Sequence, residues 1–263
     1  MSEERAGKAE AHARTLKDSP LRLDRVSHSF GAVKVLEDIG LEIGRGEFVA
    51  VVGPSGCGKT TLLNLLSGFY RPTEGVVERS GTARMVYQSD GLFPWLTVAE
   101  NILLGLRHLG DEAQRKRQLN DLMGLIRLDG FADHYPHQLS GGMRQRVELA
   151  RALAGDTDTL LMDEPFSSLD YQTRLRMRRM LVRVLSEQPR TVVLVTHDIE
   201  EAAQLADRVV VLSERPARIS DEIRLELERP RDLTHPIVIN AVKRILDELG
   251  LRENAPELTP TGR

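Results

Sequence analysis

Residues 53–61 combine residue types and spacing that suit phosphate binding. They read Gly-Pro-Ser-Gly-Cys-Gly-Lys-Thr-Thr, which fits the pattern G-x-x-x-x-G-K-[ST]. The glycines permit backbone angles that a Cβ would forbid, so successive N–H groups can point at one anion. We expect Lys59 to reach the β- and γ-phosphates and the Thr60 hydroxyl to bind Mg²⁺. This phosphate loop predicts binding of a nucleoside triphosphate by Gly53, Pro54, Ser55, Gly56, Cys57, Gly58, Lys59, Thr60 and Thr61.

The residues on either side of the phosphate loop strengthen this prediction. The apolar run 48–52 does not alternate with polar residues, which indicates a buried parallel strand. Residues 62–66 continue as a helix, whose N-terminus adds unpaired donors and partial positive charge. A glycine-rich turn that happens to end in lysine is the alternative. A strand and a helix in register with the loop argue against it.

Three side chains that could act on the phosphates follow two later apolar strands. Asp163 and Glu164 end the strand 159–162, and His197 follows the strand 190–196. Asp163 suits the surroundings of Mg²⁺, Glu164 could polarise an attacking water, and His197 could reach the γ-phosphate. The two acids could instead only begin a helix. The phosphate loop upstream makes this second interpretation the weaker one. No catalytic role is expected for the other six histidines.

Other segments carry weaker signals. Phe30 could be a core residue at a strand end or an aromatic face for a purine. Gln88 follows a strand and would lie near the phosphates. Ser140, Gly141 and Gly142 begin a helix with bare N–H groups, which is either a second anion site or a plain helix start. The apolar segment Leu92, Phe93 and Trp95 is either tucked under a domain or docked on another chain, and docking is favoured.

The composition limits the classes of function that are compatible with this chain. The 263 residues are 41% hydrophobic and 29% charged, as in an ordinary soluble domain. The net charge of −3 gives no basic field for nucleic acid, so none is expected as a partner. The single cysteine excludes an internal disulfide. No apolar run approaches the roughly 20 residues that span a bilayer, and no secretory signal begins the chain.

The pattern of elements predicts an α/β fold. Residues 21–26 and 35–43 alternate as an antiparallel sheet, and residues 76–88 form two strands split at Ser80-Gly81. Helices are expected over 98–109, 113–126 and 144–153, and again from 170 to 183 with its arginines facing solvent. A final amphipathic helix carries Val238, Val242, Ile245 and Leu249 on one face. Residues 1–20 are expected to be a disordered leader, 21–230 one α/β domain with an inserted helical subdomain at about 97–155, and 231–263 a helix and tail.

In this order, the phosphate loop, Gln88, Leu139–Gly142, Asp163-Glu164, Ser168-Leu169-Asp170 and His197 resemble the ATPase subunits of ATP-binding cassette transporters. The resemblance covers about residues 21–215. The segments 93–98, 196–202 and 212–216 look like the nitrate, sulfonate and taurine import group. The resemblance implies a P-loop NTPase (RecA-like) core with an antiparallel β subdomain and an inserted α-helical subdomain. Met143 departs from the glutamine that is usual in the family.

The resemblance also implies roles for these residues. Phe30 would stack on adenine, Glu164 would be the base, His197 would hold the γ-phosphate, and Gln88 would touch Mg²⁺ and the attacking water. Asp170 joins the nucleotide-binding residues, and Ser140, Gly141 and Gly142 would act on ATP held by a second copy of the chain, so hydrolysis needs a head-to-tail dimer.

As partners, the resemblance implies a membrane permease docked near Leu92, Phe93 and Trp95 and, indirectly, a solute-binding protein. The chain would lie at the cytoplasmic face of the inner membrane and import a small anionic solute. A soluble cassette ATPase working on DNA, ribosomes or cofactor assembly is the alternative, and Glu164 and His197 argue against an inert nucleotide-binding scaffold.

Overall fold

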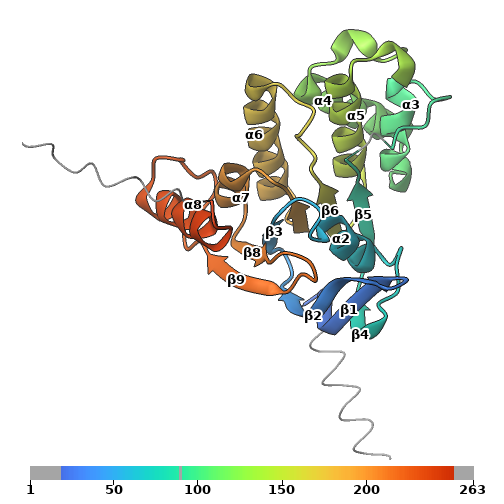
Figure 1. Cartoon of the computed structure of the whole chain (residues 1–263). Coiled ribbons are helices and arrows are strands. Elements are labelled where there is room, and N and C mark those ends of the chain that lie inside the picture. Colours follow the sequence, from blue (N-terminus) through green and yellow to red (C-terminus); the bar gives the residue numbers. More distant parts are fainter. Residues whose placement is uncertain (1–18, 89–90, 252–263) are drawn as a thin grey trace, which may run out of the picture.

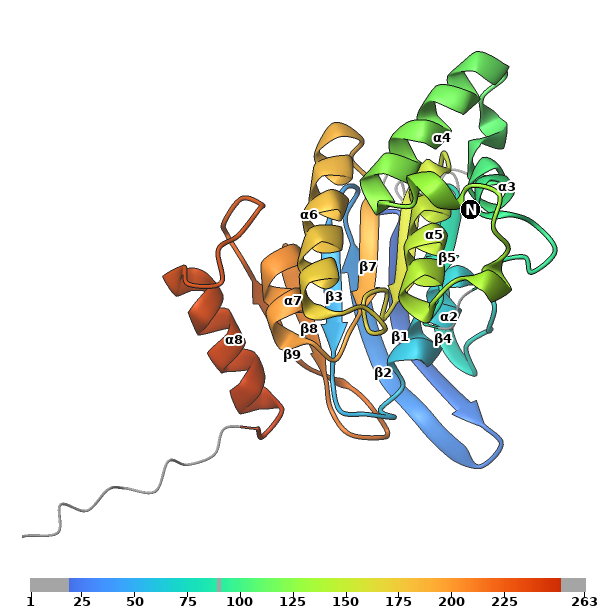
Figure 2. The ribbon, with the colours of Figure 1, turned by 90° about the horizontal axis from the view of Figure 1, so that it is seen from above.

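The computed structural model describes residues 19–88 and 91–251. Two sheets and a group of helices make up these residues, with the larger sheet at the centre (Figures 1 and 2). Most of the predicted leader and the tail beyond residue 251 lie outside the described residues. None of the described helices is long and apolar enough to cross a membrane.

The central sheet has six strands in the order β5-β6-β7-β3-β8-β9. All its neighbouring strands pair in parallel except β8 and β9. The strands β3, β6, β7 and β8 are buried along their whole length, which explains their unbroken apolar runs. The bounds are β3 Phe48–Val52, β5 Ala83–Val86, β6 Thr159–Asp163, β7 Thr191–Val195, β8 Arg208–Leu212 and β9 Ile219–Arg224.

A smaller antiparallel sheet in the order β2-β1-β4 covers one side of this core. Its strands are β1 Leu21–Phe30, β2 Val33–Ile43 and β4 Glu74–Arg79. The two strands predicted over 76–88 belong to different sheets, because Gly81 turns the chain at a φ of +76°. Asp158 then accepts the backbone N–H of Thr82 at 2.8 Å and fixes the start of β5 beside β6. The antiparallel subdomain expected from the sequence is confirmed.

The helical insertion predicted near residues 97–155 contains no strand. It holds α3 Val98–Leu103, α4 Glu112–Ile126 and α5 Gly141–Ala154, with short 3₁₀ turns between them. Thr97 and Glu100 cap α3 reciprocally. The prediction of a single helix over 98–109 is wrong, because α3 ends before a 3₁₀ turn at Gly105–His108. A Cβ at Gly105 would lie 2.4 Å from the Arg151 carbonyl oxygen, so this turn packs directly against the backbone of α5.

The remaining helices flank the sheet or close the chain. They are α2 Lys59–Ser67, α6 Tyr171–Glu187, α7 Ile199–Leu205 and α8 Pro236–Glu248. In α8, Val238, Ala241 and Ile245 are buried, whereas Val242 and Leu249 pack at the margin of the core. The α8 helix packs on α7 (Figure 2). Strand β9 was not expected from the sequence, because its residues Ile219–Arg224 are mostly polar and exposed at the sheet edge.

Arg208 at the start of β8 ties the two sheets together. Its guanidinium donates to Glu47 at 2.7 Å and to Glu222 at 2.6 Å. It also donates to the carbonyl oxygen of Glu42 in β2 at 2.5 Å. Because the Arg208 side chain is only 7% exposed, removing it would leave carboxylates without their partner in a largely buried place.

We predict that Arg208→Met lowers the free energy of unfolding by about 3 kcal/mol. Chemical denaturation followed by circular dichroism measures this change. Arg183→Ala is the matched control, because Arg183 pairs with Glu187 on the exposed face of α6, where a pair contributes about 0.5 kcal/mol or less. Equal losses in the two variants would contradict the structural role of Arg208.

Candidate active site

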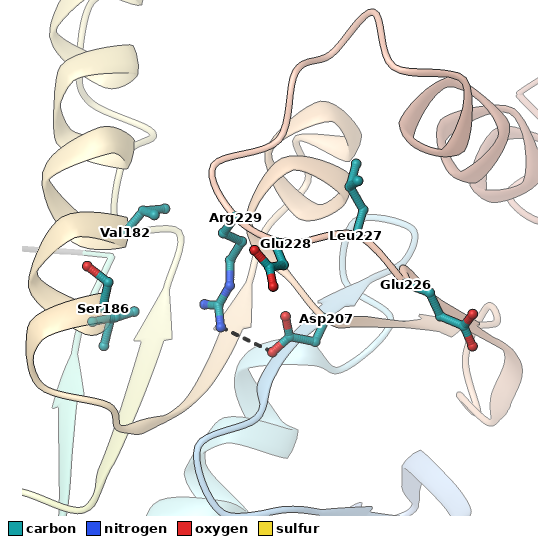
Figure 3. A pocket seen from close by; sticks show the side chains of 8 residues that line it. Val182, Ser186, Asp207, Glu226, Leu227, Glu228 and Arg229 are labelled. Atoms are coloured by element: carbon teal, nitrogen blue, oxygen red, sulfur yellow. Dashed lines mark hydrogen bonds and ion pairs between the residues drawn. The ribbon is translucent and has the colours of Figure 1, made fainter.

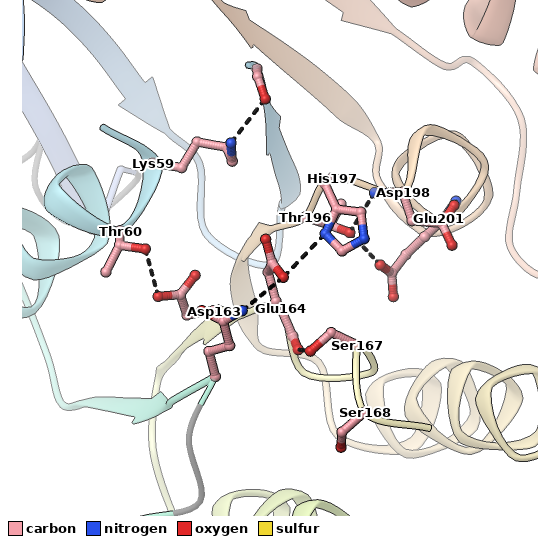
Figure 4. A network of polar contacts seen from close by, with 12 residues as sticks. Lys59, Thr60, Asp163, Glu164, Ser167, Ser168, Thr196, His197, Asp198 and Glu201 are labelled. Carbon is pink, nitrogen blue, oxygen red and sulfur yellow. Dashed lines mark hydrogen bonds and ion pairs between the residues drawn. The ribbon is translucent and has the colours of Figure 1, made fainter. Parts of the chain in front are cut away.

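The residues predicted to act on phosphates meet at one edge of the central sheet (Figure 4). Strands β3, β6 and β7 are parallel and adjacent, so their carboxyl ends lie side by side. The phosphate loop follows β3, Asp163 and Glu164 stand at the end of β6, and Thr196 and His197 follow β7. Open α/β sheets bind their ligands at this edge.

The backbone of the phosphate loop depends on its glycines. Gly56 and Gly58 have φ angles of +74° and +125°, in the region that side chains disfavour. A Cβ at Gly58 would lie 2.8 Å from Val35 Cγ1, and one at Gly53 would lie 3.0 Å from the Leu212 carbonyl oxygen. Cys57 is buried, and burial raises the pKa of its thiol. The loop is therefore closely packed from behind.

Lys59 lies across the phosphate loop. Its ammonium donates to the carbonyl oxygens of Gly53 at 2.8 Å and Pro54 at 2.9 Å. Lys59 also begins α2, so a cation and a helix N-terminus meet at one place. This combination suits an anion such as a phosphate.

Thr60 and Asp163 form a pair that fits a magnesium ion. The Thr60 hydroxyl donates to Asp163 Oδ2 at 2.8 Å. Burial raises the pKa of Asp163, the hydrogen bond from Thr60 opposes this rise, and nearby Glu164 adds to it. A bound cation would favour the ionised carboxylate. Mg²⁺ is typically bound by one or two carboxylates together with substrate phosphates and water, and Thr60 and Asp163 are suitable ligands for such a site.

Glu164 contacts both of the other predicted catalytic side chains. Its Oε2 atom lies 3.1 Å from His197 Nδ1 and accepts a hydrogen bond from Gln88 Nε2 at 3.1 Å. The structure thus brings together three residues that are far apart in the sequence. The Glu164 side chain is only partly exposed, so these two contacts fix the orientation of its carboxylate.

The backbone of Glu164 is strained, with a φ of +47°. Such a conformation costs about 1–3 kcal/mol in a residue with a side chain and persists only where its surroundings fix it. The Glu164 N–H donates to the Val195 carbonyl oxygen at 2.8 Å. The Glu164 carbonyl oxygen accepts from Gln145 Nε2 at 3.2 Å. Strain of this kind is concentrated at functional sites.

Asp198 holds the chain directly after His197. It accepts the backbone N–H of Glu201 at 2.9 Å and so caps α7. It also pairs with Arg178 at 2.5 Å and Arg174 at 3.3 Å. Burial opposes its ionisation, but these hydrogen bonds and charges outweigh burial and lower the pKa of Asp198.

The prediction that the arginines of α6 face solvent is therefore wrong for Arg178. This side chain is 4% exposed and lies between Asp198 and Glu201. Glu201 is buried too, which raises its pKa, and its carboxylate contacts the Thr196 hydroxyl at 2.5 Å. The sequence carried a signal for this cluster. Arg174 and Arg178 are one helical turn apart, and Asp198 and Glu201 face them from the start of the next helix.

Ser140 caps α5 by accepting the N–H of Met143 at 3.3 Å. Gly141 and Gly142 follow as the first residues of that helix. A Cβ at Gly142 would lie 3.3 Å from Leu169 Cδ2, so the glycine lets this helix start approach residues 168–170. Asp170 caps α6 by accepting the Thr173 N–H at 3.0 Å, and the hydrogen bonds from Thr173 lower its pKa. Two helix starts therefore lie next to each other.

Phe30 is not a buried core residue, since 46% of it is exposed. It stands at the end of β1 with its ring 4.7 Å from the ring of His28 and 5.4 Å from that of Tyr70. His28 and Tyr70 stack on each other at 5.4 Å. Phe30 is thus a half-exposed aromatic side chain beside two further rings.

The segment predicted as a docking surface divides into a buried and an exposed part. Leu92 is buried in the main core, so its expected place on the docking surface is wrong. Phe93 and Trp95 are 40% and 69% exposed, and their rings lie 5.4 Å apart. Fully buried Asn101 holds the segment by donating to the carbonyl oxygens of Phe93 and Leu96 and accepting the Phe93 N–H. Sequence reasoning did not identify Asn101.

A surface pocket of about 470 Å³ lies elsewhere in the molecule (Figure 3). It is lined by α6 and by residues 226–229, and it contains the ion pair between Asp207 and Arg229 at 3.3 Å. Asp207 precedes β8, so this pocket is at the amino end of that strand. None of the predicted site residues lines it. Because ligands of such sheets bind at the opposite edge, the pocket is not part of the phosphate site.

Comparison with known proteins agrees with the geometry of the site. Residues 36–167 match the family model described as ABC transporter. An aliphatic sulfonates import ATP-binding protein of Rhodococcus jostii (strain RHA1) is 45% identical over 89% of this chain and 95% of its own length. A taurine import ATP-binding protein of Jannaschia sp. (strain CCS1) is 43% identical over 74% of this chain and 76% of its own length.

Solved structures agree as well. The ATP-binding cassette MJ0796, seen as a dimer in a post-hydrolysis state with ADP and Pi, is similar at a TM-score of 0.70 and 31% identity. The match covers 79% of this chain and all of that one. The predicted fold class, an α/β P-loop NTPase core with an antiparallel β subdomain and an inserted helical subdomain, is thereby confirmed. With the family model and these relatives, the site identifies the chain as a member of the ABC transporter family and an ATPase cassette.

Proposed function

We propose that this chain is the ATP-hydrolysing subunit of an importer for a small anionic solute of the sulfonate or taurine type. The observation that carries the ATPase assignment is the meeting of Gln88, Glu164 and His197 beside the phosphate loop. The solute class follows from the names of the relatives from Rhodococcus and Jannaschia. Those names also favour import over the alternative of a soluble cassette acting on DNA, ribosomes or cofactor assembly.

Each site residue has a role in this proposal. The phosphate loop, Gly53–Thr61, binds the phosphates through its N–H groups and Lys59, and Phe30 stacks on adenine. Glu164 accepts a proton from the attacking water, Gln88 orients that water, and His197 donates a hydrogen bond to the γ-phosphate. Thr60, Asp163 and Gln88 hold Mg²⁺, which neutralises phosphate charge when bound. The contacts of Glu164 with Gln88 and His197 support this division of roles.

The second half of each site belongs to another copy of the chain. Ser140, Gly141, Gly142 and Asp170 are at two adjacent helix starts, which suit a nucleotide held by a partner across a two-fold axis. The dimeric cassette with ADP and Pi supports such an assembly. ATP would close the dimer, and hydrolysis would release it.

Phe93 and Trp95 are proposed as the docking surface for a permease. Phe93 also lines a pocket of about 230 Å³, together with Leu104, Arg151 and five further residues. Arg151 stands 5.6 Å from the centre of the Phe93 ring, so an apolar surface borders a cation. Aromatic residues around a pocket are typical anchors of protein interfaces. The chain would then lie at the cytoplasmic face of the inner membrane, reaching a solute-binding protein only through the permease.

The domain boundaries are part of the same proposal. Residues 21–230 form the ATPase domain, with the helical subdomain at about 97–155, and residues 231–263 form the C-terminal helix and tail. Pull-down of the tagged chain from its native membranes tests the importer assignment. Recovery of a hydrophobic permease supports it, and recovery of only soluble partners or nucleic acid would favour the alternative.

We predict that Glu164→Gln lowers the ATP turnover number by roughly 100-fold or more, while ATP affinity changes little. The amide keeps the size and the contacts of the side chain but cannot accept the proton. Steady-state phosphate release and nucleotide titration measure the two quantities, and the closed dimer should accumulate in gel filtration with ATP. Unchanged turnover would remove Glu164 from the mechanism.

Lys59→Ala is expected to weaken ATP binding by about 10- to 100-fold, because charge-assisted hydrogen bonds to phosphate are lost. Titration with a fluorescent ATP analogue measures the dissociation constant. Lys34→Ala serves as a control, since Lys34 pairs with Glu37 on the surface of β2. Tight binding retained by Lys59→Ala would contradict the phosphate-loop assignment.

For Trp95→Ala we expect roughly 30-fold weaker association with the permease, as for a central aromatic anchor, and unchanged ATP affinity. Co-purification after co-expression with the permease subunits, at graded concentrations, measures the association. Phe69→Ala is the matched control, since Phe69 is 71% exposed but belongs to the turn after α2. Normal association of Trp95→Ala would exclude this docking surface.

A further inference from the structure

The segment 212–216, Leu-Ser-Glu-Arg-Pro, has no role in the proposed mechanism although it helps to define the resemblance to the import group. Leu212 ends β8, and residues 213–216 begin the connection between β8 and β9. The backbone of this connection is fixed on both sides. Ser213 N–H donates to the Arg218 carbonyl oxygen at 2.9 Å, and Arg218 N–H donates to Ser213 Oγ at 3.0 Å.

The connection is also joined to β2. Ala217 N–H donates to the Val35 carbonyl oxygen at 2.9 Å, and the Ala217 carbonyl oxygen accepts the Glu37 N–H at 2.9 Å. Leu36, which lies between these two partners, packs on Gly58 of the phosphate loop. The connection therefore has a fixed position relative to that loop, and Figure 2 shows the two next to each other at one end of the sheet.

Arg215 reaches from this connection to the phosphate loop. Its Nη2 donates to the carbonyl oxygen of Gly56. The same nitrogen lies 3.8 Å from the position that a Cβ on Gly56 would occupy, so it stands against this residue. The Arg215 charge also acts on Cys57, where it partly offsets the rise that burial causes in the pKa of the thiol. Arg215 and Glu214 line a surface pocket together with residues 54–57.

The bond from Arg215 fixes the direction of one peptide unit. In a trans peptide the C=O and the N–H point to opposite sides. With the Gly56 carbonyl turned toward Arg215, the N–H of Cys57 must point the other way. That N–H donates to the Pro54 carbonyl oxygen at 3.3 Å, which is beyond the usual range for N–H···O bonds. It is a weakly engaged donor, ready to bind a stronger acceptor.

Lys59 acts on two other carbonyl groups of the loop. It binds the carbonyl oxygens of Gly53 and Pro54, while Arg215 binds that of Gly56. Two cations thus engage three carbonyl groups of the loop. A carbonyl bound to a cation also polarises its peptide unit and makes the N–H a better donor.

We propose that Arg215 is a positioning residue for nucleotide binding, acting through the Gly56 carbonyl to hold the Cys57 N–H ready for a phosphate oxygen. Its ligand class is a nucleoside di- or triphosphate, and its charge adds to the attraction for this anion. The inference rests on the proposed nucleotide site. It predicts that loss of Arg215 weakens the binding of ADP as well as ATP, because the two phosphates of ADP suffice to contact the phosphate loop.

The test compares Arg215→Ala, Arg215→Lys and Arg218→Ala in the full chain. Arg218 lies on the same connection but pairs with Glu37 at 3.0 Å, so it is a matched loss of charge away from the phosphate loop. Calorimetric titration with ADP should give a dissociation constant roughly tenfold weaker for Arg215→Ala. Arg215→Lys should recover part of this loss, and Arg218→Ala should remain within about twofold of the wild type.

Two further readouts separate positioning from a merely structural role. Turnover at saturating ATP should stay within about twofold in Arg215→Ala, because chemistry is unchanged once nucleotide is bound. Hydrogen exchange of the peptide containing residues 53–60 should be faster in Arg215→Ala without nucleotide, while exchange elsewhere is unaffected. Exchange that rises throughout the protein would overturn the positioning role.

Equal ADP affinity in Arg215→Ala and the wild type would overturn the inference, and so would equal weakening in Arg218→Ala. These outcomes do not contradict the nucleotide site as long as the wild type binds ADP and Lys59→Ala binds it much more weakly. If the wild type binds neither ADP nor ATP, the nucleotide site itself is wrong. The two failures are thus distinguishable.

Discussion

The parallel pairing of β3, β6 and β7 is the constraint on which the site depends. Thr60 and Asp163 are 103 residues apart in the chain, and they share a hydrogen bond only because two of these strands end at the same edge. All three strands are buried along their whole length. A shift of register by one residue would exchange the two faces of each strand and would separate the side chains that meet at this edge.

The polar residues at this edge of the sheet are fixed in place by hydrogen bonds and ion pairs with residues beneath them. Glu164 keeps an unfavourable backbone angle because strand β7 and Gln145 bind its main chain. Asp198 supports the turn after His197, and buried Arg178 supports Asp198. Buried charges are costly unless they are paired, and here each pair also fixes a direction. Groups that are already aimed need little reorganisation when charge develops during the reaction.

The site is also close in sequence to the exposed aromatic residues. Gln88, which binds Glu164, stands five residues before Phe93. Buried Glu148 accepts the N–H groups of Tyr87 and Gly91, so α5 holds the chain on both sides of the intervening segment. Helix α5 begins at Gly141, beside Ser140. One helix therefore joins the helix start proposed to face a second copy with the segment proposed to face a permease.

The phosphate loop, the acids at the strand end, His197 and the α/β class could all be predicted from the sequence, because each prediction rests on a local pattern of spacing or apolar runs. Which side chains meet depends on how distant elements pack together. The sequence predicts that Arg178 faces solvent, but α6 packs so that this side chain pairs with Asp198. It also predicts that Leu92 lies on a docking surface, but Leu92 is buried in a segment that Asn101 holds in place. Strand β9 is too polar to be recognised without β8 beside it. The link between Arg215 and Gly56 likewise spans 159 residues. Pairings of this kind arise from the packing of distant elements, which local periodicity does not encode.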